Sequence, residues 1–152
     1  MAIQKLQQSR AVSVIPSDNG GIYAPWAPVI TEATATTTNA SFIEATGVDF
    51  SNVEVGDIVV SAGSGVTSVI TQVDTGNDRI ACLTAGFSGT QFSIFKPMSG
   101  LLYIGGTGNL AVVTDGGDEV TFSALPAGSF IPVHIRKVKA TGTSATDILA
   151  LW

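Results

Sequence analysis

Few side chains in this sequence are of types that do chemistry, and the one histidine lies in the C-terminal third. His134 and Arg136 alternate with apolar residues in an extended pattern, so both belong to the polar face of a predicted strand. A catalytic histidine needs a nucleophile and a carboxylate that orients it, and no sequence neighbour supplies either. We therefore predict no enzymatic activity, and an exposed strand face whose cations suit contact with an acidic neighbour.

Three carboxylates, Asp115, Asp118 and Glu119, crowd one short segment and offer the oxygen ligands that calcium prefers. Their spacing lacks the alternating carboxylates of an EF-hand loop. The pair Asp115-Gly116 instead fits a tight hairpin turn, because such a turn needs positive φ angles that glycine adopts readily. We predict a solvated hairpin here and no bound metal.

The string Gly105-Gly106-Thr107-Gly108 has the look of a phosphate-binding loop. No Lys-Ser/Thr pair follows it, and no helix begins there to contribute its N-terminal amides. We predict a turn at this point and no cofactor. Cys82 is the only cysteine, which excludes an intrachain disulfide, and we expect it to be a small buried hydrophobic residue.

Composition favours a protein whose surface is partly covered by neighbours. Charged residues make up 12% of the chain, about half the roughly 25% that is usual in soluble domains, and hydrophobic residues make up 45%. The net charge of -5 argues against nucleic acid as a partner, since that affinity comes mainly from clustered Lys and Arg. The chain shows neither a signal peptide nor an apolar run near the ~20 residues of a membrane span. We expect synthesis in a cytoplasm, no membrane contact, and solubility until assembly.

Short apolar runs separated by Gly, Pro, Asn and Asp extend along the whole chain. Turn signals recur about every 8 to 12 residues and no stretch has a helical apolar period. This pattern predicts an all-β protein with very little helix, built from small antiparallel β-barrel or sandwich modules. In one predicted strand, Ile131, Val133 and Ile135 share a single, core-facing side.

Two separated parts of the chain resemble one short phage protein. The shared strings are Arg10-Ala11-Val12, Pro16-Ser17-Asp18, Tyr103 to Gly108, Pro126-Ala127-Gly128, Pro132 to Val138 and Thr141 to Thr146. They are similar to the spike base family of tailed phages and gene transfer agents, over residues 9 to 18 and 101 to 152. The resemblance implies a structural protein of a virion.

Between those parts the sequence departs from the family pattern, because residues 26 to 97 look like a β module inserted into a loop. Such an insertion is tolerated because the cost of closing a loop grows only logarithmically with its length. The implied domains are an N-terminal arm at 1–10, a discontinuous β module of 11–25 and 98–152, and the inserted module at 26–97. The strand at 11–15 should then pair with strands of the C-terminal part.

The function that we expect is that of a head decoration (cement) protein, which stabilises a capsid by bridging its major capsid subunits. We expect it on the outer surface of the virion head, as a homo-oligomer with a trimer favoured. The alternative is a base or adaptor that anchors a head spike or tail fibre and binds that spike or fibre protein. A more remote alternative is a carbohydrate-binding adhesin.

Six residues are expected at subunit contacts. Trp152 closes an apolar C-terminus that is costly to expose, at roughly 25 cal/mol per Å² of apolar surface, and core packing is favoured over subunit contact. Trp26 lies between two prolines at the proposed module boundary, where it would pack between modules or contact another protein. The complete set is Lys5, Arg10, Trp26, His134, Arg136 and Trp152.

Overall fold

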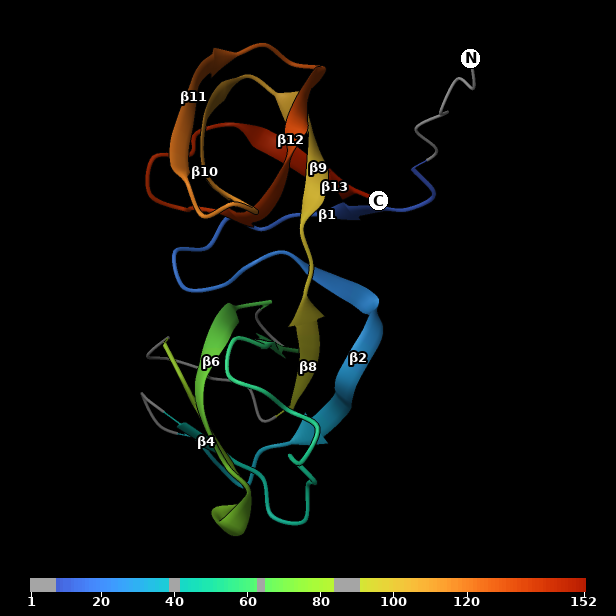
Figure 1. Ribbon diagram of the computed structural model, residues 1–152, viewed down its shortest axis with the longest axis vertical. Coiled ribbons are helices and arrows are strands. Elements are labelled where there is room, and N and C mark those ends of the chain that lie inside the picture. Colours follow the sequence, from blue (N-terminus) through green and yellow to red (C-terminus); the bar gives the residue numbers. More distant parts are fainter. Residues whose placement is uncertain (1–7, 39–41, 63–64, 84–90) are drawn as a thin grey trace. The chain divides into compact units, whose positions relative to one another are not determined.

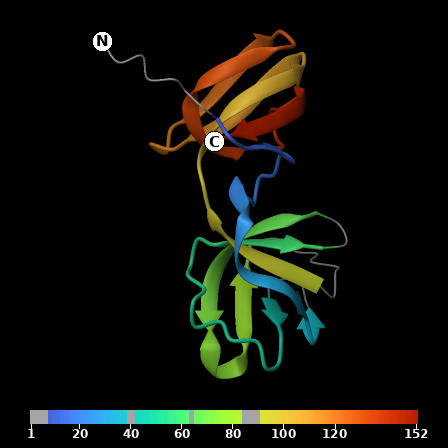
Figure 2. The same ribbon diagram turned by 90° about the vertical axis from the view of Figure 1, so that its right-hand side faces the viewer.

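The computed structural model describes residues 8–38, 42–62, 65–83 and 91–152. The chain divides into two compact units: unit 1 comprises Met1–Pro16 and Ser99–Trp152, and unit 2 comprises Ser17–Met98. Each unit holds one antiparallel sheet (Figures 1 and 2), so the all-β prediction is confirmed. Both sheets are open, because each strand order ends in two edge strands, and neither is a closed barrel.

Helix is almost absent from the described ranges. They contain the 3-10 turn η1 (Thr75–Asn77) and no α-helix. None of the described segments forms an apolar helix long enough to cross a membrane.

The sheet of unit 1 joins the two ends of the chain. Its strands follow the order β1-β13-β9-β12-β10-β11, and β9 lies between β12 and β13 (Figure 1). Their bounds are β1 Ala11–Ser13, β9 Gly100–Gly106, β10 Gly108–Thr114, β11 Glu119–Leu125, β12 Ser129–Val138 and β13 Thr146–Leu151. Val12 of β1 pairs with Ala150 of β13, which is the type of pairing expected from the sequence.

Unit 2 is a second sheet with its own core. Its strand order is β2-β8-β5-β6-β7-β4-β3. The bounds are β2 Tyr23–Thr34, β3 Thr37–Thr38, β4 Phe42–Glu44, β5 Ile58–Ser61, β6 Thr67–Asp74, β7 Arg79–Cys82 and β8 Gln91–Pro97. Isoleucines and phenylalanines fill its centre, and Cys82 is buried beside them as predicted.

The first boundary between the units lies at Pro16, nine residues earlier than the boundary predicted after residue 25. Residues 17–25 belong to unit 2 because their backbone bonds lie there: Val69 N donates to Asn19 O at 2.8 Å, and Met98 N donates to Ile22 O at 2.9 Å. Pro25 and Pro28, which were predicted to mark the boundary, lie inside β2. They are tolerated because β2 is an edge strand with register shifts, and an edge strand leaves some donors out of the ladder.

The prediction that Ile131, Val133 and Ile135 of β12 share one core-facing side is wrong for Val133. Ile131 and Ile135 are buried, but Val133 between them is 41% exposed. Ile131 pairs with Leu102 and Ile135 with Gly100, so four steps along β12 match two along β9. The extra residues form a bulge, and a bulged segment does not keep the simple two-residue alternation of an ideal strand.

The predicted turn at the glycine-rich string is also wrong. Gly105 and Gly106 end β9, Gly108 begins β10, and Thr107 alone separates the strands. The glycines permit close approach of a neighbouring segment: a Cβ on Gly105 would lie 2.7 Å from the Cβ of Asp147. Any larger residue there would push β13 away from β9.

The predicted hairpin between β10 and β11 is confirmed, but the glycine with a positive φ is not the predicted one. Val112 pairs with Val120, and Thr114 N donates to Asp118 O at 2.9 Å to close the turn. Within the turn Gly117 has a φ of 97°, whereas Gly116 does not have a positive φ. The four-residue connection therefore places the left-handed position one residue later than the Asp-Gly pattern predicts.

Candidate interaction surface

One side of the sheet in unit 1 is apolar without being part of the core. Directly opposed residues of antiparallel strands point to the same side of a sheet. Leu149 is paired with Tyr103, Tyr103 with Phe130, and Leu151 with Leu101. Adding the partners of β13 on the edge strand defines the outer face: Ala11, Ser13, Leu101, Tyr103, Phe130, Leu149 and Leu151.

The opposite side of the same strands is the core of unit 1. Its residues alternate with those of the outer face and are buried: Leu102, Ile104, Ile131, Ile148 and Ala150. The side chains of the outer face are half-buried or exposed, although they are almost as apolar as the core. A contiguous apolar surface of this kind is typical of an interaction site.

Phe130 is the most exposed aromatic residue of the outer face, at 65%. Its ring lies 5.1 Å from the ring of Tyr103, at an interplanar angle of 58°. This tilted contact is a favourable geometry for two aromatic rings. Because Tyr103 holds one side of the ring, Phe130 is presented in a defined orientation, as an anchor residue at an interface would be.

One end of the outer face carries a carboxylate. At this end Asp147 lies over Gly105, since a Cβ on that glycine would meet the Cβ of Asp147. Arg10 does not carry the other end: Arg10 N donates to Trp152 O at 3.1 Å and Trp152 N donates to Arg10 O at 3.0 Å, so these directly opposed residues point to one side of the sheet. The outer face therefore has an acidic end at Asp147, and Arg10 belongs to the same side of the sheet as Trp152.

Trp152 belongs to the core side of the sheet. Its ring lies 3.1 Å from the Cβ position of Gly100, which alternates with Leu101 of the outer face. The indole N–H donates to Ser99 O at 2.8 Å, and the side chain is half-buried. Trp152 therefore covers the end of the core and leaves the outer face to the leucines and aromatic residues.

The other residues proposed for subunit contacts are scattered. Lys5 lies outside the described residues. Arg10 is exposed next to the edge strand β1, and Trp26 is half-buried in β2 of unit 2. His134 and Arg136 are exposed on β12, as the sequence predicts.

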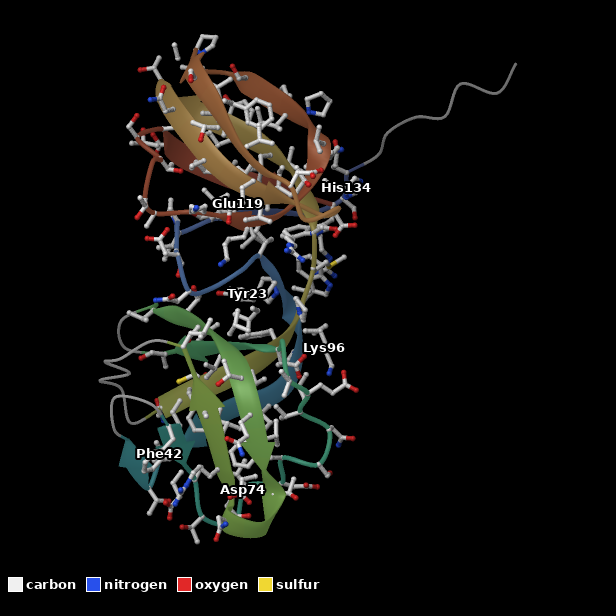
Figure 3. The ribbon with its side chains drawn as sticks, turned by 60° about the vertical axis from the view of Figure 1, so that its left-hand side comes forward. Tyr23, Phe42, Asp74, Lys96, Glu119 and His134 are labelled. Carbon is white, nitrogen blue, oxygen red and sulfur yellow. The ribbon has the colours of Figure 1, made fainter. Side chains whose placement is uncertain are left out.

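The structure brings His134 and Arg136 to the acidic hairpin turn of the same chain. Asp115 N donates to His134 O at 2.9 Å, and Arg136 Nη2 lies 3.8 Å from the Cβ position of Gly117. Nearby, Lys139 Nζ donates to Glu119 Oε2 at 2.9 Å, and Figure 3 shows Glu119 and His134 in this part of unit 1. Lys139, which follows β12, thus has an acidic partner within unit 1.

Asp118 of this turn forms local hydrogen bonds with Thr114. Asp118 N donates to Thr114 Oγ1 at 3.1 Å, and Thr114 Oγ1 donates to Asp118 Oδ2 at 3.5 Å. Over the described ranges no three His, Cys, Asp or Glu side chains gather as metal ligands would. The turn closes the hairpin between β10 and β11.

Lys96 is a titratable group of unit 2 with two carboxylate partners (Figure 3). Its Nζ donates to Glu54 Oε2 at 2.9 Å and to Asp57 Oδ2 at 3.0 Å. The hydrogen bond to Glu54, followed by the bond and charge of Asp57, raises the pKa of Lys96 above its usual value. Lys96, in β8, thus links two carboxylates that precede β5 to the neighbouring strand.

Sequence reasoning missed the outer face, although a signal for it exists. Leu101 to Ile104 and Ile148 to Leu151 are uninterrupted apolar runs. A strand with one solvated side alternates polar and apolar residues, whereas an uninterrupted run indicates a strand covered on both sides. In unit 1 the second side of these runs is the outer face.

Charge is divided unequally between the units. Unit 1 has five Lys or Arg and four Asp or Glu, a net charge of +1, whereas unit 2 has two and eight, a net charge of -6. The acidity of the chain therefore belongs to unit 2, and the unit that carries the outer face is close to neutral.

Comparisons of the chain with protein-family models, with curated proteins and with solved structures gave no match.

Proposed function

We propose that the protein is a non-enzymatic structural component of a tailed-phage virion. The observation that carries the proposal is the apolar outer face of unit 1, a surface suited to burial against another subunit. The sequence resemblance to the spike base family supports it, because the residues that carry the resemblance belong almost entirely to unit 1.

Within this class, we propose a head decoration protein that binds across joints between major capsid subunits. A ligand that binds only the assembled shell stabilises it by mass action, in proportion to the logarithm of its concentration over its dissociation constant. Such a role needs buried surface and no reaction. His134 and Arg136, exposed on β12, are proposed to meet acidic groups of the shell.

Unit 2 is proposed to be the solvent-facing part of the assembled protein. Its net charge of -6 favours solubility and disfavours close packing against further copies of the same unit. This division assigns docking to unit 1 and the properties of the exposed surface to unit 2.

The second candidate is a base or adaptor for a head spike or tail fibre, and the family resemblance itself favours it. The two roles differ in abundance, because a cement protein occupies the whole shell and an adaptor only its special positions. A carbohydrate-binding adhesin is less favoured, since the neighbours of Phe130 on the outer face are Tyr103 and leucines rather than Asp or Asn.

The test uses particles that contain this chain. Quantitative mass spectrometry should find copies comparable in number to the major capsid subunit. Heads assembled without the protein should lose their DNA at a lower temperature, and addition of the purified chain should restore the original temperature. Unchanged head stability without the protein would exclude the cement role, and a copy number limited to the vertices or tail would favour the adaptor.

A further inference from the structure

We infer that Asn19 is a site of spontaneous deamidation and that the hydroxyl of Ser17 slows this modification in the folded chain. Asn19 is the only asparagine in the sequence that is followed by glycine. Deamidation begins when the backbone nitrogen of the next residue attacks the side-chain amide, and glycine leaves that nitrogen open because it has no Cβ. Asn19 is exposed in the segment before β2, where water can complete the reaction.

The reaction needs only the chain and water. Gly20 N loses its proton and attacks Asn19 Cγ, which closes a cyclic imide. The bond between Cγ and Nδ2 breaks, and Nδ2 leaves as ammonia together with that proton. Water then opens the ring at either carbonyl carbon. Opening at Cγ gives aspartate, and opening at the main-chain carbonyl carbon gives isoaspartate, in which the main chain runs through Cβ and Cγ.

The fold restrains the attacking nitrogen through Ser17. Gly20 N donates to Ser17 Oγ at 2.9 Å, and Asn19 N donates to the same oxygen at 3.3 Å. Gly20 N must give up its hydrogen bond before it can lose its proton and turn toward Asn19 Cγ. A hydrogen bond of ordinary net strength corresponds to a factor of about 2 to 10 in rate. Removal of the Ser17 hydroxyl should therefore speed deamidation by a factor of this size.

Strand β6 also holds this peptide. Val69 N donates to Asn19 O at 2.8 Å. Gly20 is buried, and a Cβ added to it would lie 2.0 Å from Thr67 Oγ1. Closing the imide ring rotates the peptide between Asn19 and Gly20, which this close packing does not allow. Modification therefore requires local opening of the segment, and local opening costs at most as much free energy as unfolding of the whole chain.

Isoaspartate at this position disturbs the segment by which the chain enters unit 2. It adds a carbon to the main chain between Asn19 Cα and Gly20 N, and the space beside Gly20 is already filled by Thr67. The hydrogen bond that Val69 N donates to Asn19 O is the contact most directly displaced. We expect the backbone amide of Val69 to exchange its hydrogen faster in the isoaspartate form, whereas the amides of β9 in unit 1 keep their rates.

Peptide mapping by mass spectrometry of the full chain, incubated in a mildly alkaline buffer, tests the inference. Asn19 should convert to the acid before any other asparagine, and fragmentation that distinguishes the two main-chain linkages should detect isoaspartate. Ser17→Ala should deamidate about 2 to 10 times faster than the wild type, and Ser17→Thr, which keeps a hydroxyl, should stay close to the wild-type rate. The matched control is Ser129→Ala, which removes a hydroxyl that donates to Pro126 O in unit 1 and should leave the rate at Asn19 unchanged.

Urea distinguishes the effect of the fold from that of the sequence. In the unfolded chain Asn19 should deamidate faster than in the folded chain, and the wild type and Ser17→Ala should react at the same rate. Earlier conversion of another asparagine, an unchanged rate in folded Ser17→Ala, or a difference between the two chains that persists in urea would each overturn the inference. Unchanged hydrogen exchange at Val69 in the isoaspartate form would contradict the expected loss of its bond to Asn19 O.

Discussion

Asp57 and Glu54 both bind Lys96, but one carboxylate is buried and the other is exposed. Comparing them distinguishes the contribution of buried hydrogen bonds to stability from that of an exposed ion pair. The side chain of Asp57 is 3% exposed and that of Glu54 is 78% exposed. Asp57 also accepts a hydrogen bond from Glu54 N at 2.9 Å, so it holds both the backbone and Lys96. A buried carboxylate with two donors is expected to matter far more than an exposed ion pair.

We expect Asp57→Ala to lower the free energy of unfolding by about 1 to 3 kcal/mol, because Glu54 N and Lys96 Nζ both lose a buried acceptor. Glu54→Ala should lower it by only about 0 to 0.5 kcal/mol, since exposed ion pairs contribute little. Urea denaturation of the two variants measures both values. Equal losses would show that the charge of Lys96, rather than the buried hydrogen bonds, is what matters.

The Tyr23 hydroxyl is expected to make the stability of the folded chain depend on pH in the alkaline range. Burial raises the pKa of its hydroxyl, and its ring stacks on Phe95 at 4.7 Å. A raised folded pKa gives stability that is complete below the unfolded value of about 10 and is lost as pH rises through the folded value. The raised pKa of Lys96 acts in the same direction above about 10.4.

The melting temperature should therefore fall as pH rises above about 10, and Tyr23→Phe should make that fall shallower. Tyr103→Phe changes the only other tyrosine and serves as the control. Thermal unfolding followed by circular dichroism across this range measures the difference. The same slope in wild type and Tyr23→Phe would contradict the prediction.

At the scale of elements, the β10–β11 hairpin offers two adjacent glycines that differ in backbone conformation and not in packing. Gly116 and Gly117 are adjacent, and a Cβ on either would have only ordinary contacts, at 3.7 Å and 3.8 Å. Only Gly117 has a positive φ. Gly117→Ala should lower the free energy of unfolding by about 1 to 2 kcal/mol, whereas Gly116→Ala should change it by less than about 0.5 kcal/mol. Chemical denaturation measures both losses of stability. The Asp-Gly pattern predicts the opposite result, a larger loss for Gly116→Ala than for Gly117→Ala.

Much of the element pattern can be predicted from the sequence, because strands and turns have local signatures. The hairpin at residues 115–118 and the strands that begin near Thr67, Arg79 and Gln91 follow from alternation and turn residues. Register is not local, because it depends on the partner strand. The bulge in β12 that exposes Val133, and the edge position that lets β2 contain prolines, are therefore invisible in single segments.

The candidate site was predicted less well for the same reason. His134 and Arg136 stood out by their chemistry, and the sequence correctly places them on an exposed strand side. The outer face is formed by residues that stand out only when β13, β9 and β12 are side by side. Tyr103 and Phe130 are 27 positions apart, and only the register makes them neighbours.

At the scale of the whole molecule, each unit has a core of its own. The large buried cluster of unit 2, including Ile43, Ile70 and Phe92, contains no residue of unit 1. Leu102 and Ile104 are fully buried within the sheet of unit 1. Separate cores are the feature that lets one domain be inserted into a loop of another, because each part can then satisfy its own packing.

This organisation predicts that damage to one core stays in its unit. Phe92→Ala should remove about 3 to 5 kcal/mol from unit 2, and Leu102→Ala about 2 to 5 kcal/mol from unit 1, since both side chains are fully buried. Hydrogen exchange measured by mass spectrometry should show faster exchange in β5, β6 and β8 for the first variant, and in β9, β12 and β13 for the second. Because β1 pairs with β13 at the edge of the sheet, it should follow the second variant despite lying far from Leu102 in the sequence. Faster exchange throughout the chain in either variant would mean that the two units unfold as one.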